Sequence, residues 1–335
     1  MTEIPQQPEP GSPEAAAAGG EARERLVAVR REVAKAVVGQ DAAVSGLLVA
    51  LLCGGHVLME GVPGTAKTLL VRTLAASLSV DTRRVQFTPD LMPGDITGSM
   101  VIDSRQGELS FREGPIFTNL LLADEINRTP PKTQSALLEA MQERQVTVEG
   151  ETFPLAAPFH VLATANPIEY EGTYPLPEAQ LDRFLLRVSF GYPSPGEEYD
   201  VLARRLERRQ EEVDLQRITD ADGLLAMQAA VETVTVDESV GRYCVDLATA
   251  TRTHSDVLTG ASPRGSLGLV LAARAFAPIR RRDYVIPEDV KAVARPVLGH
   301  RITVRPELWM TEASGRSVVD AVLAKVPTPA TLERR

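Results

Sequence analysis

The chain has 335 residues, of which 44% are hydrophobic and 24% are charged. This composition supplies enough apolar surface for a sizeable core and excludes a globally disordered chain, while the length favours about two domains. Lys and Arg total 36 against 45 Asp and Glu, so the formal net charge is −9. An acidic chain is a poor non-specific binder of nucleic acid, and we expect no nucleic-acid partner.

The cysteines and the termini indicate the compartment. Cys53 and Cys244 are too few for a disulfide framework, and without a Cys-x-x-Cys pair we expect no structural zinc site. Residues 1–20 contain no Lys or Arg, so they do not have the pattern of a signal peptide. Their proline, glycine and alanine content predicts a disordered tail, and we expect a second short tail at 329–335. The sequence therefore predicts a cytoplasmic protein.

One segment has the length of a membrane span. The 18 residues between Asp41 and Glu60 are uncharged, which meets the usual length of a transmembrane helix. Gly54-Gly55 interrupts the segment, so we expect a buried helix over about 42–53 and then a buried strand at 56–60. No transmembrane segment is predicted.

Short apolar segments alternate with helical ones through the first two thirds of the chain. An amphipathic helix is predicted over 21–38, and the apolar segments predict strands at 56–60, 84–87, 119–124, 160–165 and 184–190. Helices are predicted between and after them at 67–79, 131–142 and 194–210. Strands this apolar suit a parallel sheet that is flanked by helices on both faces.

Two insertions and a helical region complete the predicted organisation. Residues 99–112 and 144–155 each have the pattern of a β-hairpin. Beyond about residue 212 the strand signal fades, and helices are predicted at 222–233, 238–254, 264–277, 287–296 and 313–325. We therefore predict an α/β domain over 21–210 and an all-helical domain over 212–328.

A glycine-rich segment joins a predicted strand to a predicted helix, and it reads Gly61-Val62-Pro63-Gly64-Thr65-Ala66-Lys67-Thr68. In this setting backbone N–H groups of the loop and the helix N-terminus point at phosphate groups. In the pattern G-x-x-x-x-G-K-[ST], Lys67 would reach the β- and γ-phosphates of ATP and Thr68 would ligate Mg²⁺. Ala66 replaces the second glycine, so the loop can form if this position needs no positive φ. The alternative is a glycine-rich turn followed by a surface lysine.

Polar residues follow two of the predicted strands. Asp124 and Glu125 end the strand 120–124, where Asp124 suits Mg²⁺ held through its waters and Glu125 suits the activation of an attacking water. Asn166 ends the strand 161–165, and its amide would hydrogen-bond the water or the γ-phosphate. The alternatives are a helix cap for the acidic pair and a simple Asn-Pro turn.

Taken together, these motifs resemble the AAA+ ATPases and, within them, the MoxR family. The segments that carry the resemblance are GVPGTAKT at 61–68, FTPDLMPGDITG at 87–98, LLLADEINR at 120–128, LATANP at 162–167, YPLPEAQLDRF at 174–184 and GASPR at 260–264. The resemblance extends over about residues 25–325. It implies a P-loop core with a parallel sheet, a helix-2 insert, a hairpin before sensor 1 and a C-terminal helical lid.

The resemblance also implies roles for individual residues. Val38-Gly39-Gln40 is similar to the segment that lines the adenine pocket, and Asn166 matches sensor 1. Arg183 matches the arginine finger that acts on a neighbouring subunit's ATP, and Arg264 matches sensor 2 in the lid. In relatives with the helix-2 insert the lid is displaced, so the resemblance leaves open whether Arg264 serves its own nucleotide. The alternatives are a surface ion pair of Arg183 with Asp182 or Glu178 and, for Arg264, a charge at a helix start.

The function implied by the resemblance is ATP hydrolysis in a ring, expected to be hexameric, that remodels client proteins. Clients with von Willebrand factor A domains are implied at the level of the family. A magnesium-chelatase-like motor subunit is the nearest alternative, and an ATP-gated scaffold with little turnover is another. A DNA-acting motor is disfavoured because the tip of the second hairpin, Glu149-Gly150-Glu151, is acidic.

Overall fold

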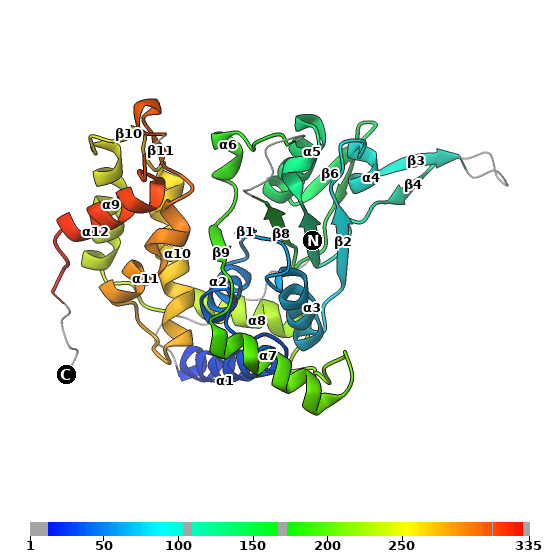
Figure 1. The fold of residues 1–335 in the computed structure, drawn as a ribbon, viewed down its shortest axis with the longest axis horizontal. Helices are drawn as coiled ribbons and strands as arrows, with labels where there is room; N and C mark the ends of the chain where they lie inside the picture. Colours follow the sequence, from blue (N-terminus) through cyan, green and yellow to red (C-terminus); the bar gives the residue numbers. More distant parts are fainter. Residues whose placement is uncertain (1–12, 103–108, 167–172, 310, 331–335) are drawn as a thin grey trace.

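The computed structural model describes residues 13–102, 109–166, 173–309 and 311–330. Its centre is a parallel sheet in the order β2-β5-β8-β1-β9 (Figure 1). These strands are β1 (Val57–Gly61), β2 (Thr82–Gln86), β5 (Leu120–Asp124), β8 (His160–Ala165) and β9 (Leu186–Phe190). The predicted α/β class with a parallel sheet is confirmed.

Helices cover both faces of the sheet because its central strands are apolar on both sides. In β5, Leu120 and Leu122 pack into one buried cluster with α1 (Pro13–Ala36), α2 (Asp41–Leu52) and α3 (Lys67–Leu78). Leu121 and Ala123 pack into the other with α4 (Pro93–Thr97) and α5 (Pro131–Glu143). The alternation follows from the two-residue period of a strand.

Two segments near the N-terminus test predicted boundaries. Helix α1 begins at Pro13, inside the segment predicted as a disordered tail. Alanine has the highest helix propensity of any residue type, and residues 15–18 are all alanine. Proline is favoured in the first turn of a helix, so both features account for the earlier start. The uncharged segment forms α2 and β1 as predicted, with a break at Gly54. Among the described residues, no helix has the length and hydropathy needed to cross a membrane.

Both predicted hairpins are present, and they contact each other. The first pairs β3 (Gly98–Ile102) with β4 (Leu109–Glu113), and the second pairs β6 (Gln145–Val148) with β7 (Glu151–Pro154), both antiparallel. The rings of Phe111 and Phe153 stack with their centroids 3.8 Å apart. The turn of the first hairpin, predicted around Arg105-Gln106-Gly107, lies outside the described residues. The first hairpin projects from the body of the molecule (Figure 1).

The C-terminal region is helical, as predicted, and contains α8 (Ala221–Glu232), α9 (Glu238–Arg252), α10 (Pro263–Ile279), α11 (Pro287–Leu298) and α12 (Gly315–Lys325). A small antiparallel sheet of β10 (Val257–Thr259) and β11 (Thr303–Val304) was not predicted. Helix α8 lies against α1 and α2 beside the sheet, where Gln228 donates to the Leu51 carbonyl over 2.7 Å. Helices α9 to α12 form the lid to one side of the core (Figure 1).

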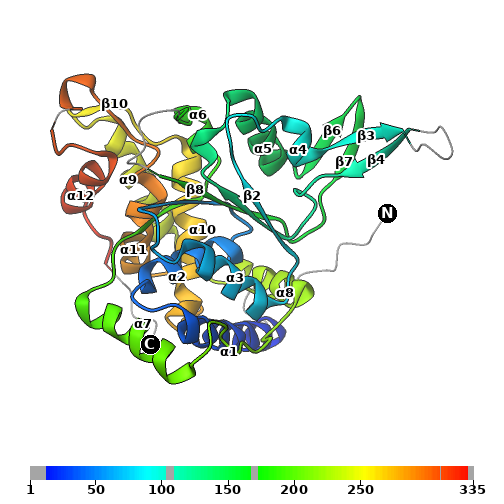
Figure 2. The same ribbon diagram turned by 45° about the vertical axis from the view of Figure 1, so that its right-hand side comes forward.

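The short helix α6 (Glu178–Leu181) precedes β9, and α7 (Pro195–Arg208) follows it at the periphery next to α1 (Figure 1, Figure 2). Two short 3₁₀ turns, Ile126–Arg128 and Pro306–Leu308, complete the described elements.

Helix α7 turns its apolar side away from the protein. None of its residues is buried, and Tyr199, Leu202 and Leu206 are 69%, 57% and 75% exposed. Their spacing of three and four residues places them in one stripe. Arg204, on the opposite side of the helix, donates to the Ala34 carbonyl at the end of α1 over 2.7 Å. The stripe therefore faces solvent in the single chain.

Candidate nucleotide-binding site

The predicted phosphate loop connects β1 to the N-terminus of α3. A Cβ atom on Gly61 would lie 2.4 Å from the Phe190 carbonyl oxygen, so the close approach of β9 requires glycine there. The Thr65 hydroxyl donates to the Val62 carbonyl over 2.9 Å and closes the loop on itself. The loop thus leads directly into a helix of 12 residues, whose N-terminal N–H groups attract anions.

Ala66 has a left-handed backbone, with φ 65° and ψ 18°. The condition that this position needs no positive φ is therefore not met. The loop forms with alanine in a conformation that favours glycine, at a cost of about 1–2 kcal/mol. Ala66 is the N-cap residue of α3, and its carbonyl accepts the first helical hydrogen bond, from Leu70, over 2.9 Å.

The backbone of Ala66 leads to a first prediction. Ala66→Gly should keep ATP affinity equal to that of the wild type or slightly tighter, because glycine adopts positive φ without steric cost. Ala66→Val should weaken ATP binding at least ~10-fold, since a β-branched residue is a severe outlier there. Isothermal titration calorimetry would measure both. Equal affinities for the valine and glycine variants would show that this conformation is not needed for binding.

Lys67 lies among three carboxylates. Its Nζ donates to the Gly61 carbonyl over 2.5 Å. Partial burial lowers the pKa of the Lys67 amine, and the nearby charges of Asp124, Glu125 and Glu60 oppose that shift. The predicted phosphate-binding lysine and the predicted acidic pair therefore lie close enough for their charges to interact.

Asp124 is held by two residues that the motif analysis missed. Its Oδ2 accepts from the Arg84 guanidinium, over 2.7 Å from Nη2 and 3.1 Å from Nε, and its Oδ1 accepts from the Thr164 hydroxyl over 2.5 Å. The side chain of Asp124 is only 14% exposed. Thr164 is a polar residue within the apolar run Val161–Ala165 of β8, which was a usable signal. Arg84 comes from β2, which pairs with β5, and the strand order was not predictable.

Glu125 follows directly, with a left-handed backbone of φ 57°. Its N–H donates to the Thr164 hydroxyl over 2.8 Å, and its Oε2 accepts from Gln86 over 2.6 Å and from Arg128 over 3.0 Å. Although Glu125 precedes a short 3₁₀ turn, its side chain makes no cap hydrogen bond. The helix-cap alternative therefore does not describe this carboxylate.

Asn166 lies at the same edge of the sheet. It follows β8, the neighbour of β5, and parallel strands end at a common edge. Asn166 is buried, with 7% exposure, and its carbonyl accepts from the Asn127 side chain over 3.4 Å. This places it two residues beyond Thr164, which contacts both Asp124 and Glu125.

Val38-Gly39-Gln40 also packs near this edge. The side-chain amide of Gln40 donates through Nε2 to the Gly191 carbonyl over 2.9 Å. Gly39 has φ 72°, and a Cβ atom on it would lie 3.0 Å from the Glu197 side chain. Residues 191–197 follow the C-terminal end of β9, which pairs with the end of β1 at Gly61.

The two predicted arginines lie elsewhere and close to each other. Asp182 forms an ion pair with Arg301 over 2.7 Å and accepts from the Ser262 hydroxyl over 3.0 Å. Among the described residues, Arg183 forms no ion pair with Asp182 or with Glu178, the two partners considered as an alternative. Arg264 is exposed, and its N–H donates to the same Ser262 hydroxyl over 3.2 Å. Arg183 and Arg264 thus flank one polar cluster at the junction of core and lid.

The residues at the sheet edge fit a magnesium nucleotide. The N-terminus of α3 and the Lys67 ammonium are suited to phosphate groups. The Thr68 hydroxyl and the Asp124 carboxylate are hard oxygen ligands of the type Mg²⁺ takes, with water completing its coordination. Within the described residues no group of three His, Cys, Asp or Glu side chains could by itself hold a metal ion. The donor set therefore suits a cation held jointly with phosphates.

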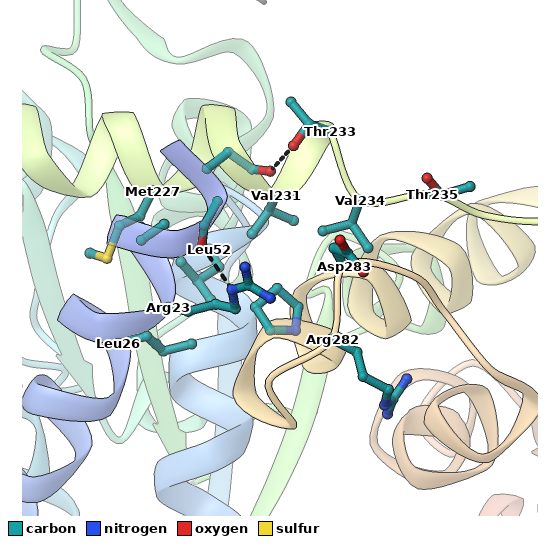
Figure 3. Close-up of a pocket in the computed structure, with 14 residues that line it drawn as sticks. Arg23, Leu26, Leu52, Met227, Val231, Thr233, Val234, Thr235, Arg282 and Asp283 are labelled. Atoms are coloured by element: carbon teal, nitrogen blue, oxygen red, sulfur yellow. Dashed lines mark hydrogen bonds between the residues drawn. The ribbon is translucent and has the colours of Figure 1, made fainter. Parts of the chain in front are cut away.

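A separate cavity of about 100 Å³ lies where α1, α8 and the start of the lid meet (Figure 3). Its walls include Leu26, Met227 and Val231. Arg23 and Thr233, two polar residues of the lining, donate to the Gly19 and Ala230 carbonyls. None of the predicted site residues lines it, so it is not part of the candidate site.

Comparisons with known proteins agree with the architecture. Residues 56–186 match the model of the ATPase family associated with various cellular activities (AAA), and residues 249–322 match the AAA lid domain. The chaperone MoxR1 of Mycobacterium tuberculosis is 45% identical over 329 residues, which cover 96% of this chain and 86% of that protein. The uncharacterized protein YeaC of Bacillus subtilis is 48% identical over 283 residues, covering 84% of this chain and 88% of YeaC.

A solved structure from Cytophaga hutchinsonii, described as a candidate ATPase, superposes with a TM-score of 0.88 at 42% identity and covers 95% of this chain and 98% of its own. The fold, the lid and these relatives lead to one assignment: the chain belongs to the MoxR family of AAA+ ATPases.

Proposed function

We propose that the protein hydrolyses ATP to ADP and phosphate in a ring of identical subunits, and that this drives the remodelling of client proteins. One observation carries the proposal. The carboxyl-terminal ends of the parallel strands bring together Lys67, Asp124, Glu125 and Asn166, whereas Arg183 lies before the N-terminal end of β9, at the opposite edge of the sheet.

The strand register gives the scale of this separation. In the parallel pair of β1 and β9, Val57 lies opposite Leu186 and Gly61 opposite Phe190. Four steps of ~3.3 Å put the two ends ~13 Å apart, and Arg183 precedes Leu186 by a further three residues. The phosphate loop begins at the far end. This separation supports the proposal that the Arg183 guanidinium acts on the nucleotide of a second chain and not on that of its own loop.

Within one subunit, each residue has a distinct role in the proposed reaction. Lys67 and the N–H groups of the loop bind the phosphates, and Thr68 and Asp124 hold Mg²⁺. When bound, Mg²⁺ neutralises charge on the β- and γ-phosphates. Glu125 orients the attacking water and takes up its proton, and Asn166 orients the same water or the γ-phosphate. Gln86 and Arg128 hold the Glu125 carboxylate in place through the hydrogen bonds given above.

Arg264 belongs with Arg183 in this proposal. Ser262 bonds both the Arg264 N–H and the Asp182 carboxylate, so the start of α10 is fastened next to the finger segment. We therefore assign Arg264 to the nucleotide of the neighbouring subunit.

Self-association has independent support from α7. Its exposed apolar stripe is a surface that another chain would cover, and large apolar patches on soluble proteins mark such contacts. A finger that acts in trans requires a head-to-tail interface, which closes into a ring when the rotation permits. We propose six subunits, following the family. We also propose a cytoplasmic location, consistent with two cysteines that are unpaired.

The client is proposed to be a protein. The relative from Mycobacterium tuberculosis is named a chaperone, and the exposed residues Glu149 and Glu151 at the tip of the second hairpin are unsuited to a nucleic-acid backbone. Clients with von Willebrand factor A domains follow from the family resemblance. Capture with the Glu125→Gln variant in ATP would identify the client.

The experiment that tests the proposal starts from Lys67→Ala. This variant should bind ATP about 10–150-fold more weakly, since a charge-assisted hydrogen bond to phosphate contributes ~1.5–3 kcal/mol. Calorimetry gives the affinity, and phosphate release gives the activity, which should be lost. Lys132→Ala is the control, because Lys132 is an exposed lysine of α5 and is not part of the loop. Unchanged ATP affinity in Lys67→Ala would remove the phosphate-loop assignment.

A further inference from the structure

Arg301 is a buried arginine that no part of the proposed reaction uses. It lies after α11 in the lid, and its side chain is only 4% exposed. A charged group is found at such a position only when it is paired and hydrogen-bonded. Its partners therefore indicate its role.

All but one of those partners belong to the segment that carries Arg183. The Arg301 guanidinium binds the Asp182 carboxylate over 2.7 Å and donates to the carbonyls of Phe184 over 2.8 Å and Leu185 over 3.1 Å. It also donates to the Val297 carbonyl within the lid. His300, the preceding residue, contacts the Phe184 carbonyl over 3.0 Å through Nε2. Arg301 and His300 of the lid therefore form hydrogen bonds with the residues on both sides of Arg183.

The remaining oxygen of Asp182 completes the cluster. Its Oδ2 accepts from the Ser262 hydroxyl, which in turn accepts from the Arg264 N–H. Burial and the charge of Arg264 lower the pKa of Arg301, and Asp182 opposes that shift. The Asp182 carboxylate therefore holds two lid residues and offsets the positive charge that the arginines concentrate there.

We propose that Asp182 and Arg301 are positioning residues that fasten the arginine finger to the lid, so that Arg183 and Arg264 are presented to the neighbouring nucleotide as one unit. This rests on the proposed role of Arg183 in trans. The segment 182–185 is short and leads directly into β9. The backbone that Arg301 holds therefore sets the direction in which the Arg183 side chain points. Misplacing a charge-stabilising group by ~1 Å is enough to lower a rate by ~10².

The test compares Asp182→Asn with a matched variant, Asp289→Asn. Asp289 likewise forms an ion pair with an arginine, Arg282, but that pair is bidentate, joins two residues of the lid and does not include the segment 182–185. Asp182→Asn should lower ATP turnover ~10–100-fold with the ATP dissociation constant unchanged. Asp289→Asn should lower the melting temperature and leave turnover per folded subunit near that of the wild type. Ser262→Ala removes the two hydrogen bonds of the Ser262 hydroxyl, to Asp182 and from the Arg264 N–H, but keeps the Asp182–Arg301 ion pair. It gives a milder variant should Asp182→Asn fail to fold, with an expected loss of ~3–10-fold.

Two further measurements separate positioning from general stability. Asp182→Asn subunits mixed with Lys67→Ala subunits should recover hydrolysis, because the first keep an intact loop and the second an intact finger. In addition, the losses caused by Asp182→Asn and Arg183→Ala should be less than additive in the double variant, since Asp182 acts in part through Arg183.

The inference is overturned if Arg183→Ala is slow while Asp182→Asn and Ser262→Ala turn over like the wild type, or if the two losses are additive. Wild-type turnover in Arg183→Ala itself would overturn the proposed role of the finger, so the two failures are distinguishable.

Discussion

Replacing Glu125 by glutamine should leave ATP binding intact and lower turnover by ~10²–10⁴, because the amide cannot take up the proton of the attacking water. The substitution preserves the size of the side chain, and the amide oxygen still accepts the hydrogen bond from Gln86. Phosphate release under saturating ATP gives the turnover, and calorimetry gives the affinity. We expect the variant to accumulate as the ATP-bound ring.

A matched control comes from the neighbouring helix. Glu139→Gln removes an exposed carboxylate from α5 and should change neither quantity. Asp124→Asn should act differently, by raising the Mg²⁺ concentration needed for half-maximal activity, since Asp124 is the proposed metal ligand. Wild-type turnover in Glu125→Gln would mean that another group activates the water.

The sheet was predictable because its strands carry their own signal. Residues Leu120–Ala123 are all apolar, a pattern that is typical of a strand covered on both faces. Their side chains belong alternately to the two buried clusters of the core. The polar residues at the ends of β5 and β8 then had to meet, because parallel strands end at one edge. The grouping of Asp124, Glu125 and Asn166 was predictable from the sequence for this reason.

Other features depend on contacts that no local pattern reveals. The left-handed backbone of Ala66 is imposed by the loop around it, against the preference of alanine. The Asp182–Arg301 pair joins residues 119 apart in the chain. Arg84 meets Asp124 only because β2 lies beside β5. Tertiary packing determines each of these three features, and the hydrophobic periodicity and residue propensities of the sequence do not predict them.

Removing the Arg183 guanidinium should have the largest effect, a loss of ~10³–10⁵ in turnover for Arg183→Ala, because it would neutralise charge that grows on the transferring phosphoryl group. The ATP affinity of the isolated subunit should not change, since Arg183 is remote from its own loop. Arg242→Ala is the control, as Arg242 is an arginine of α9 whose side chain is 75% exposed.

The location of Arg183 at the edge of the sheet opposite its own phosphate loop has two further consequences. Specific activity of the wild type should rise with protein concentration, because a lone subunit has no finger for its nucleotide. Mixing Arg183→Ala with Lys67→Ala subunits should restore part of the hydrolysis, since an intact loop then faces an intact finger at some interfaces. Analytical ultracentrifugation run beside the activity series would locate the range in which the ring dissociates. Specific activity that stays flat across that range, with no recovery on mixing, would show that the site is complete within one chain and that Arg183 does not act in trans.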